Sequence, residues 1–149
     1  RSELPLNEPV IGDIALPVDE NKLPRHKTWI PITEQNQDKF IKLCRKGKAF
    51  VSGVLYGNES EFALGDDGEI ERKIIEEEGV SPKDFISPEC LMLSSKGTRR
   101  ELVGPVYDFK YQLETDGDHE FIKVKFGLIK GTYATVLLRE FVKGSIRSY

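Results

Sequence analysis

The sequence is poor in the residues that build disulfide frameworks and metal centres. It has two cysteines, Cys44 and Cys90, and two histidines, His26 and His119. Neither cysteine belongs to a CxxC pair, so the pattern indicates neither a disulfide-stapled fold nor a zinc site. We expect each cysteine to be a small buried or half-buried thiol, and we expect no metal and no cofactor.

Long apolar runs and nucleotide-binding loops are missing as well. No stretch approaches the roughly 18 apolar residues of a membrane span, and the first residues do not form a basic segment followed by an apolar one. There is no P-loop or GxGxxG motif, and neither histidine lies beside a serine or cysteine nucleophile in a recognisable motif. These absences favour a soluble cytoplasmic protein without membrane contact and give no support to a hydrolase triad.

What is present is enough apolar sequence for a core and an uneven distribution of charge. With 149 residues and 38% hydrophobic content, we expect one domain or slightly more. The net charge is −3, yet residues 57–78 hold nine acidic and two basic residues, whereas 121–149 hold six basic and one acidic. A basic surface of this kind can recruit a polyanion. Because the chain starts with Arg1 and ends in SIRSY directly after a predicted helix, we expect a fragment or a processed piece.

Local signals predict a mixed α+β fold. The expected elements are extended runs at 10–19 and 26–33, a helix at 33–47 capped by Thr33, a strand at 48–57 with a possible bulge at Gly53, an acidic helix at 68–78 stopped by Gly79, a helix start at 81–86, strands at 102–114 and 119–129, and a helix at 132–143 stopped by Gly144. The last two strands flank TDGD, a strong hairpin signal. GDDGE (65–69) and DGDHE (116–120) lack EF-hand spacing, so we interpret both as turns.

One basic stretch, SSKGTRRE at 94–101, is a candidate phosphate-binding loop. Its hydroxyls, the close backbone approach that Gly97 allows and the guanidinium groups of Arg99 and Arg100 suit phosphate oxygens. The alternative is a solvated turn whose arginines pair with the acidic helix. The residues alone leave both interpretations open.

The last helix begins in GTYATVLLRE (131–140) and raises a question that periodicity does not answer. Apolar residues from Tyr133 to Val142 cover half of the helical wheel and predict a core-facing side. Nothing in that pattern explains why Gly131 and Thr132 open the helix so tightly.

GTYATVLLRE resembles the C-terminal motif of the TruD family of tRNA pseudouridine synthases, in which G-S-Y-A-T, an apolar pair and R-E are typical. PVIGDIALPV (9–18), VSGVLYGNESEFALGDDGEIE (51–71) and LSSKGTRRELVGPV (93–106) resemble the family's inserted domain, particularly in archaea. The four stretches occur in the right order, and the likeness covers nearly the whole chain.

The resemblance implies two parts and a catalytic role for the complete protein. Residues 1–104 correspond to the TruD-type insertion domain, and 105–149 to the hairpin and helix with which the chain returns to the catalytic domain. Gly131 and Thr132 then form a sharp turn beside the catalytic cleft, with Thr132 capping a helix that Tyr133 and Leu137 anchor in the core. Family members isomerise a uridine of tRNA, by resemblance uridine 13, to pseudouridine without a cofactor, acting on a flipped nucleotide.

The sequence departs from the family at the catalytic aspartate. The family carries it in an A-G-x-K-D stretch upstream of the insertion, which is absent here, and Lys83-Asp84 copies only its last two letters. We therefore predict no catalytic residue in this chain, and no synthase activity of the chain alone.

Two functions follow from this comparison. The first is a tRNA-binding part of the enzyme, with Lys96, Arg99 and Arg100 on phosphates, Lys130 and Arg139 near the cleft, and the missing upstream part of the catalytic domain as partner. The second is a non-catalytic RNA-binding or protein-interaction module. An exposed sheet edge left by the missing part also predicts possible self-association.

Overall fold

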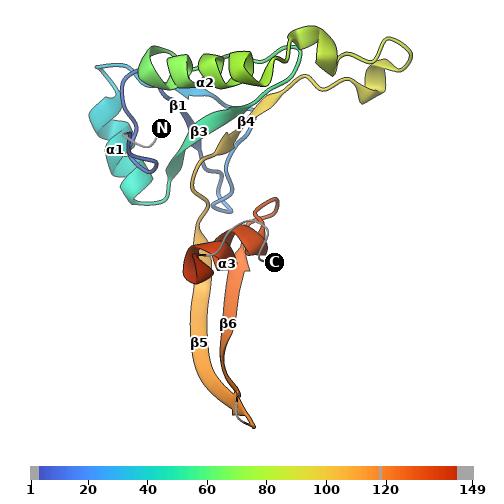
Figure 1. Ribbon diagram of the computed structural model, residues 1–149. Helices are drawn as coiled ribbons and strands as arrows, with labels where there is room; N and C mark the ends of the chain where they lie inside the picture. Colours follow the sequence, from blue (N-terminus) through green and yellow to red (C-terminus); the bar gives the residue numbers. More distant parts are fainter. Residues whose placement is uncertain (1–3, 118, 144–149) are drawn as a thin grey trace. The chain divides into compact units, whose positions relative to one another are not determined.

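The computed structural model, shown in Figure 1, describes residues 4–117 and 119–143. The chain divides into two compact units, residues 1–103 and 104–149. Helices and antiparallel sheets occur together, which confirms the α+β class. The division falls beside the boundary predicted at residue 104, whereas the assignment of the parts to an insertion domain and a catalytic segment stays a prediction. None of the described helices is both long and apolar enough to cross a membrane.

The first unit is built on a four-stranded antiparallel sheet with the order β2-β1-β3-β4. Its elements are β1 (Ile14–Pro17), β2 (Ile30–Pro31), α1 (Gln37–Arg45), β3 (Ala49–Leu55), α2 (Gly65–Glu78), the short 3-10 helices η1 (Pro82–Phe85) and η2 (Leu91–Leu93), and β4 (Thr98–Glu101). The two extended runs predicted near the start each contribute a strand, and these two strands pair with each other. The bulge predicted at Gly53 is wrong, because the register between β3 and β4 is continuous there.

The two helices α1 and α2 cover opposite faces of this sheet. Side chains alternate along β3, so Ala49 shares a face with Val51, and Ser52 shares the other face with Val54. Phe40 of α1 packs with Ala49 on the first face. On the second face, the side chain of Glu71 in α2 reaches β3 and β4. The sheet therefore has a small apolar core on one side and a polar, ion-paired core on the other.

Both helices of the first unit begin at a different residue than predicted. Asn36 is the N-cap of α1 without a side-chain capping bond, and its Oδ1 instead accepts the N–H of Thr33 at 2.9 Å in a turn ahead of the helix. The predicted cap at Thr33 is wrong. The acidic helix begins at Gly65, so the turn predicted for GDDGE is its first turn, and Gly79 ends it in the left-handed conformation as predicted.

The two thiols have different surroundings. Cys44 is half-buried beside the core of α1, and burial together with the charges of Asp13 and Glu8 raises its pKa to about 11. It is therefore a neutral packing group, as predicted. Cys90 is exposed, which corrects the expectation of burial, since it lies at the start of a short 3-10 turn outside the core.

The second unit consists of the hairpin β5 (Val106–Asp116) and β6 (His119–Leu128), followed by α3 (Ala134–Val142). The hairpin confirms the prediction from the Asp-Gly turn. A bulge lies between Tyr107 and Lys110, where Asp108 has a φ of 49°. Phe109 emerges at this bulge and stacks on Phe126 of β6 and on Phe141 of α3, with ring centroids 6.3 and 5.4 Å apart.

The start of α3 resolves the question raised by GTYATVLLRE. Gly131 adopts a φ of 90°, and the N–H of Thr132 donates to the carbonyl of Ile129 at 3.1 Å. Thr132 thus belongs to the turn, and the N-cap is Tyr133, so the predicted cap at Thr132 is wrong. Tyr133 is 72% exposed, so the prediction that it anchors the helix in a core is wrong; Phe141 of α3 instead stacks on Phe109 of the hairpin. The predicted stop at Gly144 lies outside the described residues.

Candidate nucleic-acid interface

The basic stretch at 94–101 is held against the loop that follows β3. The N–H of Asn58 donates to the carbonyl of Ser95 at 2.9 Å, and the N–H of Glu59 donates to that of Lys96 at 3.0 Å. Gly97, at a φ of 82°, allows the two backbones to approach closely. Two motifs that lie far apart in the sequence thus form one surface, and the second half of the stretch is the strand β4 rather than a loop.

Arg99 lies inside the first unit and not on this surface. Its side chain is fully buried, and its Nη2 donates to Glu71 Oε1 at 2.5 Å. Its Nε donates to Ser52 Oγ at 2.9 Å, and its Nη1 donates to the carbonyl of Glu61 at 3.0 Å. A guanidinium satisfied in this way does not reach a phosphate, so the candidate role of Arg99 is corrected. The alternative, pairing with the acidic helix, holds for this arginine.

Lys96 and Arg100 remain accessible, and both have an acidic neighbour. Lys96 Nζ lies 3.2 Å from Glu59 Oε2 with three quarters of its side chain exposed. Arg100 is about one third exposed and lies 3.3 Å from Glu101. Burial opposes ionisation of Glu101, but hydrogen bonds from His26 and the backbone, with the nearby Arg100 charge, lower its pKa overall. Glu101 is therefore a fixed anion that orients Arg100, while its other oxygen accepts from His26.

Lys130 and Arg139 belong to the second unit. Lys130 is exposed and follows β6 directly at the turn into α3. Arg139 is half-buried in the last turn of α3, where a cation is favoured by the helix dipole. The five predicted basic residues are thus divided between the two units, and one of them, Arg99, is buried.

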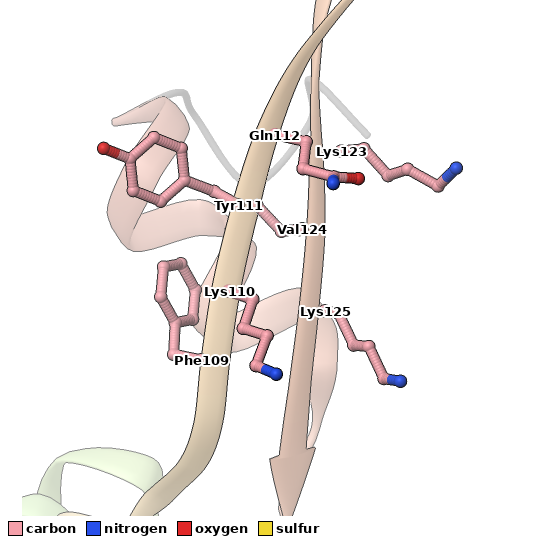
Figure 2. Close-up of a pocket in the computed structure, with 7 residues that line it drawn as sticks. All are labelled: Phe109, Lys110, Tyr111, Gln112, Lys123, Val124 and Lys125. Carbon is pink, nitrogen blue, oxygen red and sulfur yellow. The ribbon is translucent and has the colours of Figure 1, made fainter.

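A groove on the hairpin was not predicted. It has a volume of about 750 Å³ and is lined by residues 109–112 of β5 and 123–125 of β6. In Figure 2, Lys110, Lys123 and Lys125 project together from one side of the hairpin, while Phe109 and Tyr111 project from the other. Part of the signal for this groove was available in the sequence, because two lysines alternate with apolar residues in the predicted strand at 119–129, and one lysine lies between two aromatic residues in the strand at 102–114.

Comparisons with known proteins agree with the resemblance. The family model described as tRNA pseudouridine synthase D (TruD) matches residues 1–141. The chain is 42% identical to "Probable tRNA pseudouridine synthase D" of Methanococcoides burtonii, covering 96% of this chain and 33% of that protein. It is 34% identical to the protein of the same name in Natronomonas pharaonis, with 96% and 31% covered.

A solved structure shows the same arrangement of elements. The crystal structure of a Methanosarcina mazei protein assigned to tRNA pseudouridine synthase D matches with a TM-score of 0.84 and 35% identity, covering 97% of this chain and 33% of that one. The chain spans about a third of the length of the relatives it matches.

Proposed function

The chain belongs to the TruD family of tRNA pseudouridine synthases, and on that premise we propose that it serves as the tRNA-holding part of an enzyme that converts uridine 13 of tRNA to pseudouridine. The observation that carries this proposal is the match over nearly the whole chain to about a third of each relative. The remaining two thirds of such a relative leave room for the catalytic aspartate that this sequence lacks.

Asp84, the nearest sequence counterpart of that aspartate, is engaged in a structural role. Its carboxylate accepts hydrogen bonds from the N–H and the hydroxyl of Ser81, at 2.7 and 2.9 Å, which close a capping box at η1. These backbone and side-chain hydrogen bonds lower the pKa of Asp84. The cap supports our proposal that the chain contributes no catalytic residue and is inactive alone.

The second unit has an exposed apolar surface, which supports the proposal that another part of the catalytic domain binds it. Leu113 and Ile122, which face each other across the hairpin, are 77% and 62% exposed, and Val142 of α3 is 64% exposed. Exposed apolar surface on this scale is typical of an interaction site. We propose that the part of the catalytic domain outside this chain covers it.

The first test is reconstitution of activity. We expect no pseudouridine in tRNA from the chain alone, and pseudouridine when it is co-expressed with the portion of the Methanococcoides burtonii relative that the match leaves uncovered. The measurement is chromatographic separation of the nucleosides of digested tRNA, because uridine and pseudouridine are isomers of equal mass, with a stable-complex assay beside it. A stable complex that forms no pseudouridine would favour the second function, a non-catalytic binding module, and self-association without complex formation would contradict the proposed partner.

The second test concerns the proposed phosphate contacts of Lys96, Arg100, Lys130 and Arg139. We expect Lys96→Ala with Arg100→Ala to weaken tRNA binding severalfold and to flatten the dependence of log K on log salt by about 1–2, because each lost phosphate contact removes one counterion release. The control, Lys42→Ala with Lys73→Ala, removes the same charge from exposed helix positions. Equal affinities and salt slopes in the two double variants would contradict these contacts.

A further inference from the structure

The hairpin has two chemically different faces that the strand register defines. Lys110 lies directly opposite Lys125, and Gln112 lies directly opposite Lys123. Because side chains alternate, these four share one face, which we call the lysine face. The residues between them belong to the opposite, mainly apolar face. Figure 2 shows the same division, with the three ammonium groups on one side of the ribbon.

The lysine face is unfavourable for the hairpin by itself. Like charges directly opposite each other in an antiparallel pair, about 4.5–5.5 Å apart at Cβ, repel and destabilise the sheet. Lys123 has a carboxylate partner, Glu114 Oε1 at 3.2 Å. Within residues 4–117 and 119–143, Lys110 and Lys125 form no ion pair. An anion placed between these two would remove the repulsion.

We propose that the lysine face binds the phosphate backbone of an RNA helix. The inference rests on the proposed function and names a surface for its substrate. Lys123 and Lys125 occupy adjacent same-face positions of β6, roughly 7 Å apart along the strand, and Lys110 lies opposite Lys125, so that the ammonium groups can contact successive phosphates. The Gln112 amide adds a neutral donor, and the open groove admits a polymer.

The two rungs Lys110–Lys125 and Gln112–Lys123 carry no aromatic side chain, which favours a helix over a single strand. Proteins that hold single-stranded nucleic acid place aromatic side chains among the cations, and bases stack on them. Phe109 and Tyr111 point to the opposite face, so neither of these groove residues lies on the lysine face; Phe121 shares the side of the lysines but lies one rung nearer the tip, opposite Glu114. Cations without aromatics fit phosphates whose bases are paired and turned inward.

Acidic residues near the hairpin tip limit the extent of this surface. Glu114 and Asp116 follow Gln112 on the same face, so the charge changes sign toward the turn. The surface therefore consists of two rungs of the ladder, Lys110–Lys125 and Gln112–Lys123. Such a footprint suits one or two phosphates rather than an extended polyanion.

The test compares two double variants of the full chain. The hairpin variant carries Lys110→Gln and Lys125→Gln, and the control variant carries Lys42→Gln and Lys73→Gln. Fluorescence anisotropy with a labelled RNA stem-loop and an unstructured RNA of equal length is measured across salt concentrations. For the stem-loop we expect a five- to tenfold loss of affinity and a salt slope flatter by about 1.5–2 in the hairpin variant only. Its melting temperature without RNA should stay equal or rise, because the like-charge pair is gone.

Three outcomes would overturn the inference. They are unchanged stem-loop binding, the same loss in the control variant, and a loss confined to the unstructured RNA. This assay does not depend on pseudouridine formation. Reconstitution of activity can fail while the hairpin variant still loses affinity for the stem-loop. In that case the proposed function is wrong, and the inference that the lysine face binds an RNA helix is retained.

Discussion

Replacing Arg99 with methionine is expected to lower the free energy of unfolding by about 3–5 kcal/mol, because the change leaves a buried carboxylate without its counter-charge. Glu71 is 6% exposed and Arg99 is fully buried. The loss is large against the roughly 5–15 kcal/mol that stabilise a typical domain. Urea unfolding followed by fluorescence measures it, since Trp29, the single tryptophan, lies in the first unit.

The control for this prediction is an ion pair of the same type at the surface. Arg45 and Glu8 lie 2.9 Å apart with 64% and 37% of their side chains exposed. We expect Arg45→Met to change the free energy of unfolding by no more than about 1 kcal/mol, since water screens the pair. If Arg99→Met also stayed within that range, the buried network would not stabilise the first unit.

A double variant tests whether the uncompensated charge is the cause. Glu71 accepts the N–H groups of Val54 and Ala63 at 2.9 and 2.8 Å besides pairing with Arg99. In Arg99→Met with Glu71→Gln, the amide oxygen keeps an acceptor for one of these two N–H groups, which bind different oxygens of Glu71, and no isolated charge remains. We expect this double variant to be more stable than Arg99→Met alone. If the losses of stability from the two substitutions simply added, the uncompensated charge would not be the cause.

The two consecutive arginines show what the sequence could not decide. Short hydroxyls, a glycine and two arginines predict an exposed basic loop, and the preceding residues do form one. The pair itself lies on β4, where side chains alternate, so Arg99 points inward and Arg100 outward. Which of the two is buried depends on the register with β3 and on Glu71, far away in the sequence.

Elements with strong local signals were predicted correctly. The Asp-Gly turn defined the hairpin, and Gly79 ended α2, because turn and cap chemistry are encoded within a few residues. The predicted caps at Thr33 and Thr132 were wrong, because each of these residues belongs to a turn that precedes the helix. The start of α2 was missed, because Asp-Gly pairs resemble turns while the contacts that hold this helix are tertiary.

The candidate site was predictable in kind but not in position. Segregated charge and the family motifs indicated a basic surface, and the roles of Lys96, Arg100, Lys130 and Arg139 stay predictions. The lysine face needed the strand register, which places Lys110 opposite Lys125 only once the length of the hairpin turn is fixed. Alternation alone would have shown only that Lys123 and Lys125 of β6 share a side.

Gly57→Ala is expected to lower the free energy of unfolding by about 3 kcal/mol through a steric clash with backbone atoms. A Cβ at this position would meet the N of Gly97, and it would lie 2.5 Å from both the C of Lys96 and the O of Ser95. Gly57 does not have a positive φ, so conformational strain adds nothing to the effect. Urea unfolding with Trp29 fluorescence again gives the value.

Gly53→Ala is the matched control, because its Cβ would meet a side chain that can move. The nearest atom is Leu102 Cδ2 at 2.8 Å, the far end of a flexible group, and alanine suits a strand better than glycine does. We expect a change within about 1 kcal/mol. Equal stability of Gly57→Ala and wild type would show that the segments around Gly57 and Gly97 do not pack as described. If they do, Gly57→Ala also displaces Lys96, and on our proposal that Lys96 contacts tRNA we expect the tRNA affinity to fall even under conditions in which the variant stays folded.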